Sequence, residues 1–286
     1  MRYGQIRAYD VANGVGIRTS IFVTGCTHNC KDCFNRKYMD FNFGEIWTKD
    51  TTNQVIDYLR DENVSGLTLL GGEPMQNAKE LLEIVRDIKK SVNKNIWIYG
   101  DYDVDGITST SVLYLALKES GAENVNYYIP IRDEGYGLNN EALKKIKESG
   151  ADLVITVDCG ITSFPEIEFA NSIGLPIIIT DHHNLHGNKV PDAVAVVNPK
   201  RKENKFTFPS LAGVGTIFMV VMCLFERAGE KEKAYEYIDL VAIGTVADIV
   251  PLLEENRILT KFGLEKLLYS KNKGLNYLLY KLFFSG

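Results

Sequence analysis

The strongest constraint on the fold is a regular alternation of strand-like and helix-like segments between residues 95 and 180. Short runs rich in Val and Ile are each followed by a longer segment whose apolar side chains recur at helical spacing. This order predicts consecutive βαβ units, and therefore an α/β fold built on a parallel sheet. The expected strands are 95–99, 125–130, 153–157 and 176–180, and the expected helices are 108–120, 141–149 and 165–173.

The residues before this region show a shorter version of the same order. Strands are expected at 19–23 and 66–70, and helices at 52–60 and 78–90. The 286 residues are 45% hydrophobic and 24% charged, which fits globular folding and is long enough for two domains. Because the sequence motifs change in character near residue 100, we expect one domain at 1–95 and a second at 96–286.

Composition also predicts the cellular compartment of the protein. The N-terminus lacks the apolar stretch of a secretory signal, and the uncharged segment 210–225 is shorter than the ~20 residues that span a bilayer. Three of the five cysteines lie within 26–33, which indicates metal ligation in a reducing compartment and not a disulfide framework. We therefore expect a cytoplasmic protein with no membrane partner.

The second expected domain is acidic. Residues 100–286 carry 25 Asp and Glu against 19 Lys and Arg, whereas residues 1–99 carry 12 against 13. An acidic surface argues against strong non-specific binding of nucleic acid, which depends on Lys and Arg neutralising phosphates. Bound divalent cations would make the charge positive locally, at the place where a phosphate binds, so nucleic-acid binding remains compatible with this composition.

Acidic side chains follow three of the expected parallel strands. Asp101, Asp158 and Asp181 each come where a strand ends, and the carboxyl ends of parallel strands meet at one edge of the sheet. Any one of these aspartates alone is better explained as an ordinary loop or N-cap residue. Their combination with the adjacent His182 and His183 favours a common site.

The spacing of the first acidic motif suits a pair of metal ions. Asp103 and Asp105 are alternate residues in a loop that Gly106 closes, so both are expected to face a metal, with Asp158 bridging two ions. Carboxylates and imidazoles suit Mn²⁺ or Mg²⁺, and two such ions about 3.5 to 4 Å apart promote phosphate-ester hydrolysis. A helix starting near residue 108 would add its N-terminal amides as a phosphate contact.

Four motifs carry this chemistry in the second half of the chain: Gly100-Asp101-Tyr102-Asp103-Val104-Asp105-Gly106, Val157-Asp158-Cys159-Gly160, Thr180-Asp181-His182-His183 and Gly244-Thr245-Val246-Ala247-Asp248. Together with the segments 134–139 and 211–215, they resemble the motifs of DHH phosphoesterases, specifically the RecJ-like single-stranded-DNA exonucleases. The resemblance runs from about residue 96 to the end, and it implies a DHH-type parallel-sheet α/β domain.

The resemblance implies a site for two Mn²⁺ or Mg²⁺ ions and degradation of single-stranded DNA from the 5′ end. His183 is implied to contact the scissile phosphate, and Asp181 to orient the two histidines. Such proteins continue into a domain with a Gly-Gly-His motif and an oligonucleotide-binding fold, for which residues 249–286 leave no room, so weaker clamping is expected. The expected substrate is single-stranded DNA or short oligonucleotides. The implied metal ligands are Asp103, Asp105, Asp158, His182 and Asp248.

A second group of candidate ligands lies near the N-terminus. Cys26, Cys30 and Cys33 form C-x₃-C-x₂-C, which supplies three thiolates and leaves the fourth position of an iron–sulfur cluster free for a small molecule. Zinc completed by His28 is the alternative, although the position of this histidine between two ligands strains the geometry. The segment 71–74, Gly-Gly-Glu-Pro, allows close backbone approach to a ligand, and it is also compatible with a simple turn.

The cysteine motif and Gly71-Gly72-Glu73-Pro74 together resemble the radical S-adenosylmethionine family, and the segment 13–19 resembles its branch that activates anaerobic ribonucleoside-triphosphate reductase. The resemblance covers residues 1 to about 99 and implies a partial (βα) barrel, a [4Fe–4S] cluster on the cysteines, and S-adenosylmethionine bound at Gly71, Gly72, Glu73 and Pro74. It also implies that the reductase is a partner. Because further barrel strands are replaced by the Asp101 motif, we expect poor activase activity.

These observations lead to one primary function and two alternatives. The primary expectation is metal-dependent phosphodiester hydrolysis by residues 96–286, because all four motifs are present. The first alternative is a glycyl-radical activase that uses the cluster and S-adenosylmethionine. The second alternative is an inactive fusion of two truncated halves. One apolar strand at 96–99 would serve the sheet of either half.

Overall fold

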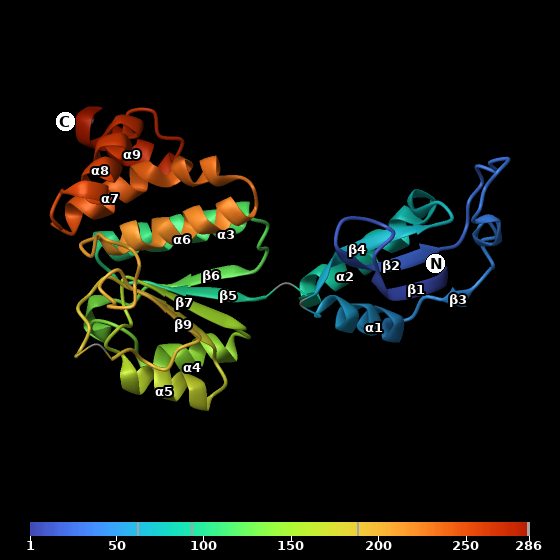
Figure 1. The fold of residues 1–286 in the computed structure, drawn as a ribbon, viewed down its shortest axis with the longest axis horizontal. Helices are drawn as coiled ribbons and strands as arrows, with labels where there is room; N and C mark the ends of the chain where they lie inside the picture. The colour runs from blue at the N-terminus through green and yellow to red at the C-terminus, as the bar shows by residue number, and fades with distance from the viewer. Residues whose placement is uncertain (62, 93, 188, 285–286) are drawn as a thin grey trace. The chain divides into compact units, whose positions relative to one another are not determined.

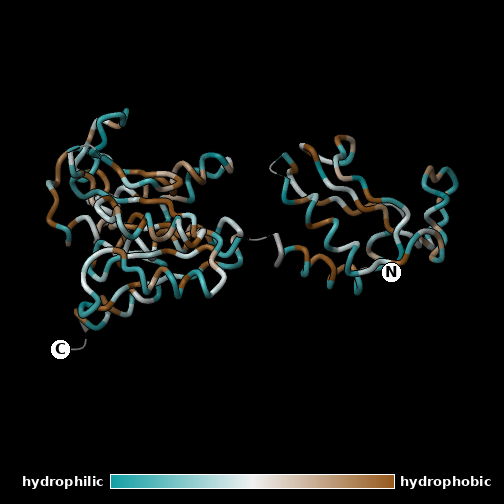
Figure 2. Tube along the Cα trace, turned by 90° about the horizontal axis from the view of Figure 1, so that it is seen from below, coloured by the Kyte–Doolittle hydropathy of each residue, from teal (hydrophilic) through white to brown (hydrophobic). Residues whose placement is uncertain are grey.

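The computed structural model describes residues 1–61, 63–92, 94–187 and 189–284. The chain forms two compact units, Met1–Asn93 and Lys94–Gly286, each with its own sheet and core (Figure 1). In both units hydrophobic segments run through the middle and hydrophilic segments form the outer loops (Figure 2). No helix in the described part of the chain combines the length and the apolar character needed to cross a membrane.

The first unit contains a four-stranded mixed sheet in the order β3-β1-β2-β4. Strand β1 (Arg2–Asp10) pairs antiparallel with both β2 (Ile17–Val23) and β3 (Glu45–Ile46), and β2 pairs in parallel with β4 (Val64–Gly71). Within the described residues of the first unit, only the β2-to-β4 connection is therefore a parallel βαβ unit. The expected partial barrel is thus too specific a description, because β1 enters the sheet as an antiparallel strand.

Two helices cover this sheet, and two short 3₁₀ helices interrupt its loops. The helices are α1 (Lys49–Leu59) and α2 (Ala78–Val92), and the 3₁₀ segments are η1 (Arg36–Tyr38) and η2 (Pro74–Asn77). Thr48 caps α1 through a reciprocal capping box with Thr51. The core joins β2 to both helices through a small set of buried side chains: Ile21, Val23, Val55, Ile56, Leu81 and Ile88.

The second unit contains a five-stranded, wholly parallel sheet in the order β6-β5-β7-β8-β9. The strands that were expected from the Val- and Ile-rich runs all form, and a fifth short strand joins the edge. Strand β5 pairs with β6 and β7, so it belongs to this sheet and not to the sheet of the first unit. The bounds are β5 (Ile96–Tyr99), β6 (Val125–Tyr128), β7 (Leu153–Val157), β8 (Ile177–Thr180) and β9 (Ala195–Val197).

Helices cover both faces of this sheet (Figure 1). Helices α4 (Asn140–Glu148) and α5 (Phe164–Ser172) lie on one face, and α3 (Val104–Glu119) and α6 (Gly213–Arg227) on the other. The segment η4 (Lys231–Tyr237) and the helices α7 (Ile238–Ala247), α8 (Glu254–Leu267) and α9 (Lys273–Phe284) lie beyond α6, and η3 (Arg132–Glu134) follows β6.

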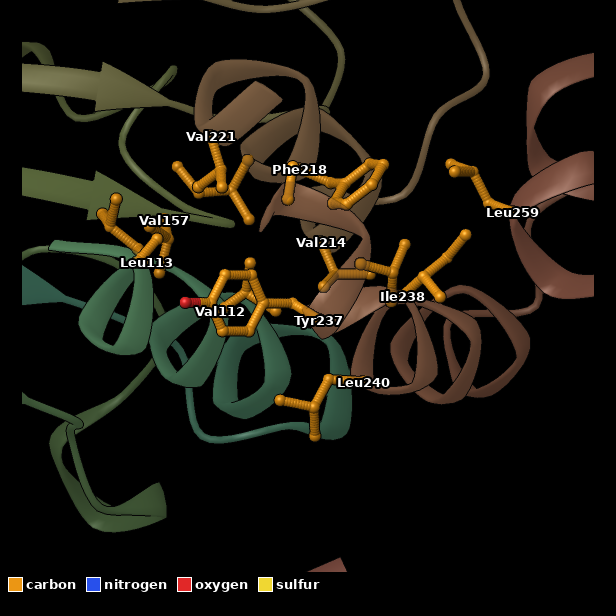
Figure 3. Packing of buried hydrophobic residues seen from close by; sticks show 14 of the residues in the cluster. Val112, Leu113, Val157, Val214, Phe218, Val221, Tyr237, Ile238, Leu240 and Leu259 are labelled. Atoms are coloured by element: carbon orange, nitrogen blue, oxygen red, sulfur yellow. The ribbon is translucent and has the colours of Figure 1, made fainter. Parts of the chain in front are cut away.

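The larger core of the second unit fixes α3 and α6 against the sheet. Val112 and Leu113 of α3 pack with Val214 and Phe218 of α6, and Val157 of β7 joins the same cluster (Figure 3). A second cluster on the opposite face packs α4 and α5 against the sheet. Each Å² of apolar surface buried in these clusters stabilises the fold by about 25 cal/mol. Packing on both faces of the sheet therefore holds the strand ends in a fixed arrangement.

One helix boundary differs from the prediction. Helix α3 begins at Val104 and not near residue 108, with Asp103 as its N-cap, so Asp105 and Gly106 lie in its first turn and not in a loop. The side chain of Asp103 accepts a hydrogen bond from the Gly106 amide at 2.8 Å. A Cβ on Gly106 would come within 2.6 Å of the Asp101 carbonyl oxygen, so this glycine permits close approach of the backbone.

Candidate functional site

The expected acidic edge of the second unit is present. Asp158 follows β7, and Asp181 and His182 follow β8, while Asp103 is the N-cap of α3 and Asp105 lies in its first turn. Asp248, the C-cap residue of α7, also belongs to this group. Because the sheet is parallel, its carboxyl ends meet at one edge, and residues far apart in the sequence reach a common volume.

His182 lies at the centre of this group. Its Nδ1 lies 2.9 Å from the Leu211 carbonyl oxygen, which can only accept, so Nδ1 is the donor and Nε2 is left to face the carboxylates. Nε2 lies 3.1 Å from Asp158 Oδ1, 3.7 Å from Asp248 Oδ2 and 3.8 Å from Asp105 Oδ2. This one imidazole nitrogen therefore lies within 3.8 Å of a carboxylate oxygen from each of three different parts of the chain.

Three of these atoms are buried without a hydrogen-bond partner within the described residues: Asp158 Oδ1, His182 Nε2 and Asp248 Oδ2. Unpartnered buried polar atoms are rare in folded proteins because each loses its hydration without compensation. A divalent cation would satisfy all three at once. The donor set of carboxylate oxygens and one imidazole nitrogen suits Mn²⁺ or Mg²⁺.

The ligand atoms also cluster as small sets whose members lie within 4.8 Å of one another. One set joins Asp105, His182 and Asp248, and a second joins Asp158, His182 and His183. A third set joins Asp101, Asp103 and Asp158. The first and third sets share no residue, so the described residues provide two adjacent groups of ligands, as expected for two ions.

Asp105 is held in place by the start of α6. Its side chain is 1% exposed, Oδ2 accepts from the Gly213 amide at 2.6 Å, and Oδ1 accepts from the Val214 amide at 2.8 Å. The positive end of the helix dipole favours a carboxylate at this position. Burial nevertheless raises the pKa of Asp105 to about 8, with the nearby charge of Asp158 as the next cause.

Asp158 occupies a strained and crowded position. Its φ is 61°, a left-handed conformation that is uncommon for a residue other than glycine, and it is 2% exposed. Burial, followed by the charge of Asp103, raises the pKa of Asp158 to about 9. A Cβ on Gly213 would lie 2.5 Å from Asp158 Oδ1, so only glycine at this position lets α6 approach the carboxylate.

Asp181 and His183 form a separate hydrogen-bonded pair beside this cluster. Asp181 Oδ1 accepts from the amides of His182 and His183 and lies 2.7 Å from His183 Nδ1, while Oδ2 accepts from the Ile161 amide. Burial acts to raise the pKa of Asp181, but the hydrogen bonds and charge of His183 outweigh it and lower that pKa. The Asp181 hydrogen bond raises the pKa of His183. Asp181 therefore orients the His183 ring as an ionised partner.

Asp103 differs from the other expected ligands because it is exposed and caps α3 with one oxygen. Asp101, which the sequence places at this sheet edge but not among the implied metal ligands, is 3% exposed and lies in the same set of candidate ligand atoms as Asp103 and Asp158. Burial raises the pKa of Asp101. The structure thus brings together all seven predicted site residues of the second unit, with Asp101 as an additional neighbour.

Sequence reasoning misses the backbone groups that hold the site. The segment 211–215 is recognisable as a motif, but nothing in a sequence indicates that the Leu211 carbonyl orients His182 or that two α6 amides hold Asp105. Tyr136 is also missed. Its hydroxyl lies 3.1 Å from His183 Nδ1 and donates to the Asp158 carbonyl oxygen at 3.3 Å.

The predicted cysteine site lies on an irregular loop after β2. Cys30 is exposed and Cys26 and Cys33 are half-buried, and all three are free thiols. The Cys26 amide donates to the Met39 carbonyl oxygen, and the Cys33 amide donates to the Cys30 carbonyl oxygen. Within the described residues, these thiols are not among the sets of ligand atoms that lie within 4.8 Å of one another.

The segment Gly71-Gly72-Glu73-Pro74 lies against the start of the cysteine loop. The Gly72 amide donates to the Val23 carbonyl oxygen at 2.8 Å, and the Glu73 amide donates to the Gly25 carbonyl oxygen at 2.9 Å. A Cβ on Gly72 would lie 2.6 Å from that Gly25 oxygen, so the glycine permits the contact. Pro74 begins η2, which the Glu73 side chain caps through the Met75 amide.

His28 also faces this segment, although not in the role considered for zinc. Its Nε2 lies 3.6 Å from Glu73 Oε2, so it is directed towards the glycine-containing segment. Gln76 accepts from the Thr27 amide and donates to the Thr27 hydroxyl, which adds a further link between η2 and the loop. The structure therefore joins the two predicted parts of the first site by backbone and side-chain hydrogen bonds.

Comparison with protein-family models gives two matches. Residues 12–119 match the 4Fe-4S single cluster domain, and residues 95–245 match the N-terminal domain of the DHH family. The matches overlap at 95–119, where the structure forms β5 and α3 of the second unit. The motif expectations for both halves are thereby confirmed at the level of family.

Among curated proteins, the single-stranded-DNA-specific exonuclease RecJ of Bacillus subtilis is 44% identical over 204 residues, which cover 70% of this chain and 25% of the relative. The RecJ of Escherichia coli is 38% identical, and the match covers 37% of its length. The chain thus spans between about a quarter and somewhat more than a third of the length of these two exonucleases. The anaerobic ribonucleoside-triphosphate reductase-activating protein of Enterobacteria phage T4 is 32% identical over 147 residues, which cover 93% of it.

Two solved structures have the same fold as the second unit. An exonuclease RecJ bound to manganese matches with a TM-score of 0.61 and 36% identity, covering 74% of this chain and 52% of that chain. RecJ from Thermus thermophilus in complex with Mn²⁺ matches with a TM-score of 0.57 and 32% identity, covering 81% of this chain and 33% of that chain. The five-stranded parallel sheet is common to these structures and this chain.

Proposed function

The chain belongs to the DHH family through residues 95–245 and also to the family of anaerobic ribonucleoside-triphosphate reductase-activating proteins, and on this basis we propose that its second unit is a metal-dependent phosphodiesterase. Its substrate is single-stranded DNA or a short oligonucleotide, degraded from the 5′ end. The observation that carries the proposal is the convergence of unpartnered, buried Asp158 Oδ1, His182 Nε2 and Asp248 Oδ2 at one sheet edge.

The proposed ions are two Mn²⁺ or Mg²⁺. When bound, such ions supply an activated water and neutralise charge on the phosphate. The residues of the chain position them: α6 fixes Asp105 through two amides, and Leu211 fixes the ring of His182 through its carbonyl oxygen. The proposed ligands are Asp103, Asp105, Asp158, His182 and Asp248.

His183 is the proposed contact to the scissile phosphate. Its Nδ1 is held by Asp181, which leaves Nε2 of the ring to face the substrate as a donor when the ring is protonated. The raised pKa of His183 increases its protonated fraction at neutral pH. Asp181 acts through the histidine, by fixing its orientation and stabilising its charge.

The test is Mn²⁺-dependent release of nucleotides from a 5′-phosphorylated single-stranded oligonucleotide by the purified chain. Asp158→Asn keeps the side-chain shape but removes the central charge, so we expect a loss of about 10²- to 10³-fold, equivalent to roughly 3–4 kcal/mol. Release of nucleotides that is equal in the two proteins would reject the assignment of the site. A folded chain without any activity would favour the inactive-fusion alternative.

A second function is proposed for the first unit. Glu73 and Gly72 are joined by hydrogen bonds to the residues that precede Cys26, which brings a glycine-containing ligand segment next to the cysteine loop. We propose that Cys26, Cys30 and Cys33 hold a [4Fe–4S] cluster, with S-adenosylmethionine contacting Gly71, Gly72, Glu73 and Pro74. The partner of this unit is the anaerobic ribonucleoside-triphosphate reductase.

Anaerobic reconstitution tests this second proposal. Iron and sulfide are expected near four of each per chain, and Cys30→Ala is expected to lose most of both, because two thiolates hold the cluster poorly. Iron content that is unchanged in Cys30→Ala would reject the ligand assignment. Transfer of a glycyl radical to the reductase is a separate measurement, since a chain can hold the cluster and still be a poor activase.

A further inference from the structure

The edge of the sheet beyond His183 carries a basic loop that neither family match assigns to the site. Strand β9 ends at Val197, and its carboxyl end lies at the same sheet edge as Asp158 and Asp181, because β9 is parallel to β8. Residues 198–205 follow directly, and they contain four basic side chains. These residues are Lys200, Arg201, Lys202 and Lys205.

Asn198 anchors this loop to the metal site. It is 2% exposed, and its side-chain amide donates to the His183 carbonyl oxygen at 3.0 Å. Its Oδ1 accepts from the Lys200 amide at 2.8 Å. The Asn198 side chain therefore links the backbone of Lys200 to the backbone of His183 through one hydrogen bond to each. These two bonds fix the position of the Lys200 backbone relative to His183.

The side chains of Lys200 and Arg201 differ in their contacts. Arg201 donates from Nη1 to the Val196 carbonyl oxygen at 2.6 Å, and its Nε lies 3.6 Å from Glu203. The side chain of Lys200 is half-buried, and among the residues that the structure describes its ammonium group has no hydrogen-bond or ion-pair partner.

We propose that Lys200 binds a phosphate of the nucleic-acid substrate next to the phosphate that is cleaved, an inference that rests on the proposed hydrolysis at the same site. A single-stranded substrate that lies across His183 brings its following phosphates towards the end of β9. A lysine held there by Asn198 provides a positive charge on an otherwise acidic edge. Arg201 supports the loop, and Lys200 contacts the substrate.

The experiment compares Lys200→Met, Lys200→Arg and the matched surface variant Lys144→Met, which removes the same charge from exposed α4. Thermal unfolding confirms that each variant is folded. With saturating Mn²⁺ and a 5′-phosphorylated single-stranded oligonucleotide, Lys200→Met is expected to lose about 10- to 100-fold in kcat/KM, mostly through KM, as for one charge-assisted contact. Lys200→Arg and Lys144→Met are expected within about threefold of the unmodified chain.

Salt dependence separates a phosphate contact from a structural role. In a plot of log affinity against log salt concentration, each phosphate contact to a single strand makes the slope more negative by about 0.7. The slope for Lys200→Met is therefore expected to be shallower by about 0.7 than the slope for the unmodified chain. An unchanged slope and an unchanged kcat/KM in Lys200→Met would overturn the proposal. A defect that extra Mn²⁺ restores would also overturn it, because it would place Lys200 with the metal and not with the substrate.

Binding measured without turnover keeps this test independent of the proposed activity. Fluorescence anisotropy with a phosphorothioate-linked oligonucleotide reports affinity and salt slope whether or not the chain hydrolyses DNA. An inactive chain that binds the oligonucleotide with the Lys200-dependent slope would reject hydrolysis and retain the phosphate contact. An active chain whose affinity does not depend on Lys200 would retain hydrolysis and reject the contact.

Discussion

The two units present their candidate ligands in opposite ways. In the second unit, buried side chains at strand ends are held by backbone groups, so that Asp158 is 2% and His182 is 6% exposed. In the first unit, the cysteines lie on an irregular loop where Cys30 is exposed and the neighbouring Phe34 is 95% exposed. A parallel sheet edge thus assembles candidate ligands from distant parts of the sequence, whereas a loop keeps its candidate ligands adjacent in the sequence and leaves their convergence to the proposed cluster.

Holding the carboxylates buried and close together is energetically unfavourable for the second unit in the absence of metal. Preorganised carboxylates repel one another and lose hydration before a metal binds, which is why the pKa values of Asp105 and Asp158 are raised to about 8 and about 9. The thiols of the first unit lie on an irregular loop, and only Cys30 among them is exposed. We therefore expect the second unit to depend on metal for stability, and the first to depend on the cluster for the shape of its loop.

Among the changes that leave every proposed ligand in place, the largest expected effect comes from closing the space beside Asp158. Gly213→Ala places a methyl group 2.5 Å from Asp158 Oδ1, and the backbone of α6 must shift to relieve it. Because that shift moves the amides that hold Asp105, we expect a loss of about 10- to 100-fold in Mn²⁺-dependent hydrolysis, as for other supports of metal ligands. Steady-state kinetics measure the loss.

Gly274→Ala is the matched control, since its nearest neighbour is the Asn272 side chain at 3.4 Å and no strained φ is required. Its activity is expected to equal that of the unmodified chain. Full activity in Gly213→Ala would show that the site tolerates movement of α6, and it would remove the argument that this unit is preorganised.

A corresponding change in the first unit sharpens the comparison. Gly72→Ala places a methyl group 2.6 Å from the Gly25 carbonyl oxygen and 2.8 Å from the Tyr38 carbonyl oxygen, both of which are backbone atoms. We expect iron incorporation to fall to about half or less, because the loop that precedes Cys26 must move away. Iron analysis after anaerobic reconstitution measures this effect, and unchanged incorporation would contradict the proposed link between the two segments.

The smallest expected effect is on stability and depends on pH. A carboxyl group whose pKa is raised by folding contributes stability that is fully present below its ordinary value of 3.8 and is lost as the pH rises through the folded value, about 9 for Asp158. In EDTA, Asp158→Asn is therefore expected to be more stable than the unmodified chain by about 1–3 kcal/mol at pH 9, and by less at pH 6. Urea unfolding at both pH values measures the difference.

Mn²⁺ should reverse this order. It stabilises the unmodified chain by about 2.7 kcal/mol at a hundredfold excess over its dissociation constant, and it should stabilise Asp158→Asn much less. A stability difference that is independent of pH and of Mn²⁺ would mean that Asp158 is not a buried carboxylate next to a metal site.

Much of the second unit is predictable from the sequence because its strands are continuous Val and Ile runs with an acidic residue directly after them. The sequence of Leu153–Val157 followed by Asp158 shows the pattern most clearly. The short strand β9, with only three residues, has too few side chains to show a period. Helix α3 starts four residues earlier than expected because Gly106 suggests a loop, whereas it permits close approach to Asp101.

The first unit is less predictable. Strand β1 alternates between half-buried and exposed residues that are mostly polar or aromatic, so it lacks the apolar run of a buried strand, and its antiparallel pairing is not expected from the sequence. The site residues are predictable as residue types in motifs. The backbone groups that orient them, such as the Leu211 carbonyl, are not, because every residue carries the same backbone atoms.

The most direct test of the account measures both proposed sites in the same preparations. Unmodified chain, Asp158→Asn and Cys30→Ala are each reconstituted with iron and sulfide and then assayed for Mn²⁺-dependent nucleotide release and for iron content. Two self-contained sites predict that Asp158→Asn loses hydrolysis and keeps its iron, and that Cys30→Ala loses iron and keeps hydrolysis. Loss of both properties in either variant, with the fold retained, would contradict the central claim that each unit carries its own site.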